Sequence, residues 1–124
     1  MDGEELKKRT KHYGLRVVRL TGSLPASRAA GIIGGQLLRC GTSVGANYRA
    51  ACRARSRPDF ISKTSIAIEE ADESLYWMEL LVDGHLMPKE KLEPLMREAD
   101  ELVAILTASV KTARANLKAS PRAR

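Results

Sequence analysis

The chain has 124 residues and a net charge of +6, and 44% of its residues are hydrophobic but only 4% are aromatic. This length corresponds to one domain, and the abundance of Ala, Leu, Glu, Lys and Arg favours helices over a β-sandwich or barrel. No apolar run reaches the roughly 18 residues that cross a bilayer, and residues 1–10 contain no signal-peptide core, so we expect a soluble, cytoplasmic protein without membrane contact.

The first helix is predicted over about residues 4–21, because apolar and small side chains recur there at steps of three and four. Its seam is formed by Leu6, Thr10, Tyr13, Val17 and Leu20. Gly22 and Pro25 then break the pattern, and Ser27 can cap the next helix.

The second helix is predicted over about residues 27–55, with its seam at Ile33, Leu37, Cys40, Val44 and Ala51, and with Asn47 or Tyr48 in between. Each glycine inside it costs up to about 1 kcal/mol relative to alanine. These glycines are Gly31, Gly34, Gly35, Gly41 and Gly45. Two explanations stay open, a close approach of a neighbouring backbone or a kink or break of the helix.

The third helix is predicted over about residues 58–83, where Ser56 can cap and Pro58 is tolerated in the first turn. Its seam is Ile61, Thr64, Ile68, Ala71, Leu75, Met78 and Val82, and Gly84 ends it. The fourth helix is predicted over about residues 88–118, with a kink or restart at Pro94. Its seam is Leu92, Leu95, Ala99, Leu102, Leu106, Ser109 and Ala113.

Because the connections are short, successive helices should be antiparallel neighbours. The predicted fold is therefore all-α, an antiparallel up-down-up-down four-helix bundle that forms a single domain over residues 1–118. Residues 119–124 are predicted to be a disordered basic tail.

Charge is distributed unevenly along the chain. Residues 6–58 contain twelve Lys or Arg and no Asp or Glu, whereas residues 64–87 contain six Asp or Glu and no Lys or Arg. In an up-down bundle the end of the second helix, the start of the first and the end of the fourth lie at the same pole. We expect this pole to be basic, with contributions from Lys7, Lys8, Arg9, Lys11, Arg49, Arg53, Arg55, Arg57, Lys63, Lys111 and Arg114.

Such a pole suits a polyanion, because cations that neutralise phosphates release condensed counterions. RNA or DNA, bound with low sequence specificity, is therefore the predicted partner. Two other interpretations stay open: an acidic protein partner, and basic side chains that only solvate a helical surface.

A second stripe on the third helix contains apolar side chains and faces away from its seam. We predict that it meets the outer face of the second helix across a homo-oligomer interface, with Trp77 and Leu80 as anchors and Glu70 or Glu73 paired to Arg39 or Arg49. The predicted interface residues are Arg39, Thr42, Ala46, Ile66, Glu70, Glu73, Trp77 and Leu80. In the alternative, Trp77 closes one edge of the monomer core.

We expect no enzymatic activity, no cofactor, no metal and no small-molecule substrate. His12 and His85 are isolated, Cys40 and Cys52 are too far apart along one helix to form a disulfide, and no Glu-x-x-His motif accompanies the glutamates. Ser43 has no visible histidine and acid partner, and no phosphate-binding glycine loop is present.

The stretch from Gln36 to Leu81 resembles the small bacterial four-helix-bundle proteins whose best-known members are encoded in intervening sequences within large-subunit ribosomal RNA genes. The residues that carry the resemblance are Gln36, Arg39, Gly41, Thr42, Ser43, Gly45, Ala46, Asn47, Tyr48, Asp59, Phe60, Glu70, Glu73 and Trp77. Ala50 departs from the pattern, since many relatives place a glutamate there. The resemblance implies an antiparallel bundle that assembles as a homopentameric ring, like the similar accessory protein of diversity-generating retroelements, which is thought to bind nucleic acid and a reverse transcriptase.

Overall fold

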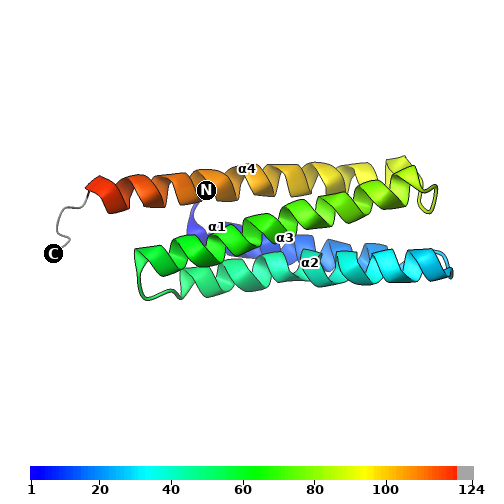
Figure 1. The fold of residues 1–124 in the computed structure, drawn as a ribbon, viewed down its shortest axis with the longest axis horizontal. Helices are drawn as coiled ribbons and strands as arrows, with labels where there is room; N and C mark the ends of the chain where they lie inside the picture. Colours follow the sequence, from blue (N-terminus) through cyan, green and yellow to red (C-terminus); the bar gives the residue numbers. More distant parts are fainter. Residues whose placement is uncertain (120–124) are drawn as a thin grey trace.

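The computed structural model describes residues 1–119, which form four helices and no strand. The helices are α1 (Gly3–Gly22), α2 (Arg28–Cys52), α3 (Arg57–Asp83) and α4 (Lys89–Ala119). They lie side by side along one long axis, with the α1–α2 and α3–α4 turns at one end and the α2–α3 turn at the other (Figure 1). The predicted tail lies outside the described residues, apart from Ala119, which belongs to α4.

Local capping sets where the helices begin. Asp2 and Glu5 form a reciprocal capping box at α1, with each side chain accepting from the other residue's backbone N–H. Ser27 and Ser56 are the N-caps of α2 and α3, which confirms the two caps expected from the sequence. The end of α2 differs from the prediction by three residues: the backbone N–H of Arg53 caps the helix, which ends at Cys52 and not at about residue 55.

The core is buried between all four helices, but α3 buries a face rotated from the predicted one. Its fully buried side chains include Ala67 and Ser74, whereas the predicted Ile68 and Leu75 are only partly buried. The reason is that α3 packs against both α2 and α4, so the residues between its two contact faces are buried most deeply. Small residues on the innermost stripe let Tyr13 of α1 reach across, where its hydroxyl lies 2.6 Å from Ser74 Oγ.

In α4 the structure replaces one predicted core residue with its neighbour. Val110 is buried, while Ser109 is only partly buried and lines a groove. The helix runs through Pro94 without restarting. None of the helices in the described part of the chain is long and apolar enough to cross a membrane.

α2 is one unbroken helix, and two of its glycines lie where α1 approaches closely. A Cβ on Gly45 would lie 3.2 Å from the backbone carbonyl of Thr10 in α1, and a Cβ on Gly41 would lie 2.8 Å from a Val17 methyl group. Side chains at these positions would therefore push α1 away from α2. Of the two explanations that the sequence left open, the close approach is the correct one for Gly41 and Gly45, whereas Gly31 and Gly35 have no atom within 4 Å of an added Cβ and are not explained by it.

Candidate nucleic-acid interface

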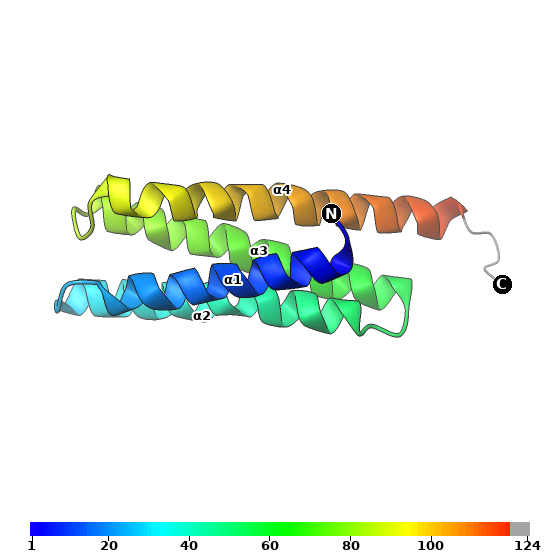
Figure 2. The same ribbon diagram turned by 180° about the vertical axis from the view of Figure 1, so that it is seen from behind.

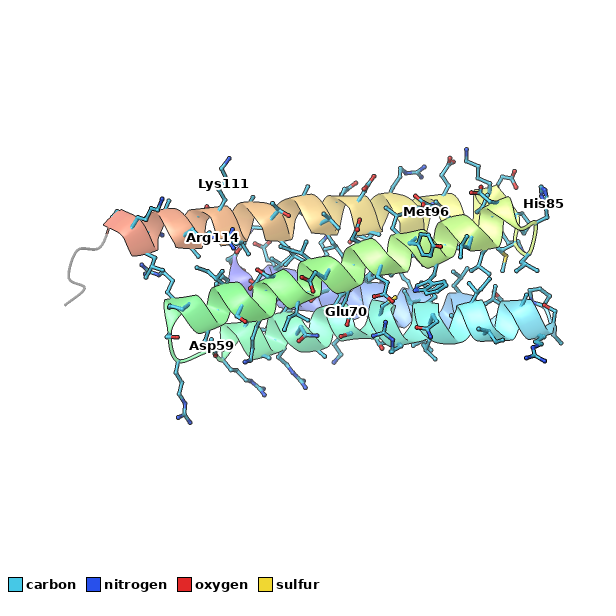
Figure 3. All side chains as sticks on the ribbon, viewed as in Figure 1. Asp59, Glu70, His85, Met96, Lys111 and Arg114 are labelled. Atoms are coloured by element: carbon cyan, nitrogen blue, oxygen red, sulfur yellow. The ribbon has the colours of Figure 1, made fainter. Side chains whose placement is uncertain are left out.

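The predicted basic residues gather around the end of the bundle that holds the α2–α3 turn. Asp59, Lys111 and Arg114 lie in this half, and His85 lies at the opposite end (Figure 3). We call this half the basic pole. The predicted cations here that are exposed and form no ion pair within the described residues are Lys8, Lys11, Arg49, Arg53, Arg55, Arg57, Lys111 and Arg114.

Three of these arginines stand on or beside the short α2–α3 connection. The backbone N–H of Arg53 donates to Ala50 O at 3.1 Å, and Ser56 Oγ accepts from Asp59 N at 3.1 Å. These caps hold both ends of the connection, so Arg53, Arg55 and Arg57 extend from a backbone that is already ordered. Long side chains at this turn project away from the bundle (Figure 3).

A second group of cations borders a groove of about 460 Å³ between α1 and α2. Lys8, Lys11 and Arg49 lie along it, and Leu15 and Val18 contribute apolar surface, with 44% and 46% of their surfaces exposed. The groove combines positive charge with uncovered aliphatic side chains. That combination suits an anionic partner that also has apolar groups.

Three predicted cations form ion pairs within the chain, and for Arg9 this corrects the expected role. Arg9 donates to Glu98 at 2.7 Å and to Glu101 at 2.6 Å, so its charge is neutralised and it is not a free cation. These carboxylates raise the pKa of Arg9 above its ordinary value, chiefly through the hydrogen bond to Glu98. Lys7 pairs with Glu4 and Lys63 with Asp59, both as exposed pairs that a ligand can displace easily. 

Positive charge is not confined to the basic pole. Arg16, Arg19 and Lys91 border a small groove of about 290 Å³ toward the other end of the bundle. This cluster was not predicted from the sequence, because its members come from distant parts of the chain. The far end also holds acidic side chains such as Asp83 and Glu90.

A groove of about 1010 Å³ lies at the basic pole and was not predicted from the sequence; we call it the end groove. It opens where α4 extends past the start of α1 (Figure 2). Its apolar part includes Leu6, Tyr48, Phe60, Ile105 and Ala113, and α4 adds Ser109, Thr112 and Asn116, while Arg57 lies at its border. The spacing of these α4 polar residues, at steps of three and four, places them on one face of the helix and could have indicated this groove from the sequence.

The predicted interface residues of α2 and α3 lie on one face and are connected within one chain. Arg39 donates to Glu73 at 2.6 Å and to Glu70 at 3.4 Å. Glu73 also accepts from the Trp77 indole N–H at 3.1 Å, and Ser43 donates to Glu70 at 3.4 Å. The expected pairing of Arg39 with these glutamates therefore occurs, but inside the chain and not across an interface.

The apolar members of that face differ in exposure. Ile66 is exposed, whereas Trp77 and Leu80 are partly buried, and Trp77 packs against the core as its alternative role required. Thr42 and Ala46 are exposed on α2. The face thus retains an uncovered apolar strip beside an ordered polar network.

No set of side chains that could hold a metal ion occurs in the described part of the chain. Both cysteines are free; Cys40 is buried and Cys52 is exposed beside the end groove. Burial raises the pKa of the Cys40 thiol to about 12, which keeps it protonated.

Comparison with known proteins agrees with this architecture. Residues 4–108, which run from α1 into α4, match the family described as 23S rRNA-intervening sequence protein. A crystal structure of a protein of unknown function, from the S23 ribosomal protein family of Bacteroides thetaiotaomicron, is also similar. It is 35% identical, with a TM-score of 0.83, and the match covers 90% of this chain and 99% of that chain. A search of curated proteins gives no match.

Proposed function

Because the chain belongs to the family of 23S rRNA-intervening sequence proteins, we propose that it is a non-enzymatic helical-bundle protein that binds RNA, or another nucleic acid, through its basic pole. Binding through phosphate contacts has low sequence specificity, because such contacts carry no sequence information.

One observation carries this proposal: the unpaired arginines Arg53, Arg55 and Arg57 extend from a capped, ordered turn. Because the backbone of this turn is already ordered, phosphate binding there costs little backbone conformational entropy, and each contact releases counterions. Lys8, Lys11 and Arg49 on one side and Lys111 and Arg114 on another extend the positive surface around the same pole.

The test replaces Arg53, Arg55 and Arg57 together with alanine and measures binding of a fluorescently labelled RNA by anisotropy. We expect the affinity to fall about tenfold or more, and the wild-type affinity to fall steeply between about 50 and 200 mM salt. The matched control replaces Arg16, Arg19 and Arg28 with alanine, which removes the same charge from the other end. Equal losses in the two variants, or binding that ignores salt, would contradict the proposal.

We further propose that the chain, as an antiparallel up-down-up-down bundle, assembles with copies of itself through the outer face of α2 and α3. The exposed side chain of Ile66 beside Trp77 and Leu80 supports a contact there, and the Arg39, Glu70 and Glu73 network would order its polar border. The family resemblance implies five copies in a ring. Such an assembly would bring several basic poles together and raise the affinity for a long polyanion.

The groove between α1 and α2 favours a second candidate function, a protein adaptor with an acidic partner. Leu15 and Val18 leave aliphatic surface uncovered beside Lys8 and Lys11, and phosphates make no use of such surface. A pull-down before and after nuclease treatment separates the two functions. Retention of partners after nuclease treatment would favour the adaptor.

A further inference from the structure

We infer that the end groove holds an unpaired nucleobase, so that the basic pole prefers single-stranded over duplex nucleic acid. This inference rests on the proposed function and deepens it, because it states which form of the polymer the pole selects. The end groove is the largest of the described hollows, at about 1010 Å³, and lies against the α2–α3 turn that carries the unpaired arginines.

The apolar part of the end groove offers what the faces of a base require. Phe60 is partly buried there, and its ring meets that of Tyr48 edge to face, with 6.5 Å between ring centroids. Ile105 of α4 also lines the end groove and is partly buried. A flat base can insert between aromatic and aliphatic walls and replace water on both of its faces, which is the usual source of base affinity in single-strand binding.

The α4 wall supplies partners for the edge of the base. Ser109, Thr112 and Asn116 follow one another at helical spacing and line the end groove, and none takes part in a side-chain hydrogen bond among the described residues. Hydroxyl and amide groups both donate and accept, so together they can match the edge of any of the bases. This explains how the end groove can hold bases without strong sequence preference.

The charge around the end groove fits the backbone that follows the base. Arg57 borders the end groove and begins α3, while Arg53 and Arg55 belong to the connection just before it. A base in the end groove places its own phosphate and the next ones near these arginines. In a duplex the base is paired and stacked, so its faces cannot enter the end groove, and only the phosphate contacts remain.

An acidic peptide could pair with the arginines. However, it would offer no flat ring to the apolar walls and no base edge to the neutral α4 side chains. Two carboxylates also line the end groove, but both are engaged within the chain: Glu4 pairs with Lys7, and Asp2 accepts from the backbone N–H of Glu5. A neutral flat ring with phosphates on one side satisfies all of these groups together.

The test compares one short fluorescent RNA, single-stranded, with the duplex that it forms with its complement, at the same salt concentration. We expect wild-type protein to bind the single strand about tenfold more tightly, the size of one base stacked on protein. Replacing Thr112 and Asn116 with alanine should reduce this preference, because the base edge loses hydrogen-bond partners while the stacking walls remain. Duplex affinity should stay unchanged, since both residues are exposed on a helix that alanine favours.

The control variant replaces Ser62 and Thr107 with alanine, which are also exposed on helices and lie outside the end groove. A preference lost equally in both variants, or unchanged in the Thr112 and Asn116 variant, overturns the inference. A second readout uses the same single strand carrying one 5-bromouracil: ultraviolet cross-linking should attach it to the peptide that contains Tyr48 or Phe60. Cross-links found only outside the end groove also overturn it.

The outcomes separate this inference from the proposed function. If single strand and duplex bind equally well, the end groove does not hold a base. The proposed role of the basic pole then still stands, provided that binding is lost when Arg53, Arg55 and Arg57 become alanine. Failure to bind either RNA at low salt removes both.

Discussion

Arg9 forms two hydrogen bonds to the carboxylate of Glu98: Nε donates to Oε2 at 2.7 Å and Nη2 donates to Oε1 at 2.8 Å. The pair links α1 to α4, which are the two neighbouring helices with the least packing between them. Only 25% of the Arg9 side chain and 16% of the Glu98 side chain are exposed, so the contact is shielded from solvent. The pair therefore stabilises the contact between α1 and α4, where the helices pack least.

Replacing Arg9 with methionine should lower the free energy of unfolding by about 1–3 kcal/mol, because Glu98 is left shielded without its partner. Urea unfolding followed by circular dichroism measures this. Lys8 is exposed on the same helix and unpaired among the described residues, so Lys8→Met should change the free energy of unfolding by less than about 0.5 kcal/mol. Similar values for the two variants would show that the Arg9–Glu98 pair does not contribute to the stability of the fold.

Two glycines of α2 should respond in opposite ways to alanine. Gly35 has no atom within 4 Å of the position that a Cβ would occupy, so Gly35→Ala should stabilise the bundle by up to about 1 kcal/mol through helix propensity alone. At Gly45 the added methyl would press on the α1 backbone at 3.2 Å, and the strain should outweigh that gain. Thermal unfolding of both variants at one protein concentration checks the contrast; equal stabilisation would disprove the close approach.

The two thiols should differ in reactivity and in their link to pH. In the folded protein at pH 8, a disulfide reagent should modify Cys52 quickly and Cys40 only after unfolding, because Cys40 is buried. Burial raises the pKa of Cys40 from 9.0 to about 12, so the unfolded chain loses this proton first. Its contribution to stability should therefore fall as the pH rises from about 9 towards 12.

The alkaline effect is checked with Cys40→Ala, whose stability should decline less steeply over the same range. The buried hydroxyl of Tyr13, whose pKa is also raised by burial, will keep some decline in both proteins. Identical slopes for wild type and Cys40→Ala would contradict the assignment to Cys40.

Assembly through the outer face of α2 and α3 predicts a specific change in mass. Ile66→Asp should lower the mass measured by light scattering at micromolar concentration, because a charge would be buried in the contact. Val18→Asp, at a similarly exposed site on α1, should leave the mass unchanged. A monomeric mass for the wild-type protein would rule out this interface.

Much of the helical architecture was predictable because it depends on neighbours in the chain. The N-caps Ser27 and Ser56 and the apolar spacing of α1 are local signals that tertiary packing did not override. The family resemblance rested on residues such as Arg39 and Glu70, and the family match supports it. The collection of cations near the α2–α3 turn followed from helix order and composition alone.

Other features depend on how the helices are rotated and how far apart they lie, which no local pattern encodes. Packing on both sides of α3 decided that Ala67 and Ser74 are innermost. The approach of α1 to α4 decided that Arg9 is held by Glu98 and is lost to any ligand.

The sequence by itself thus determined which segments are helical and where positive charge accumulates, because both follow from short-range spacing. Only the tertiary structure decided which of those charges remain available, and it alone formed the end groove. Arg57, Phe60 and Thr112 belong to that groove because α4 continues past the start of α1. A hollow between helices is a property of distances that arise only once they have packed.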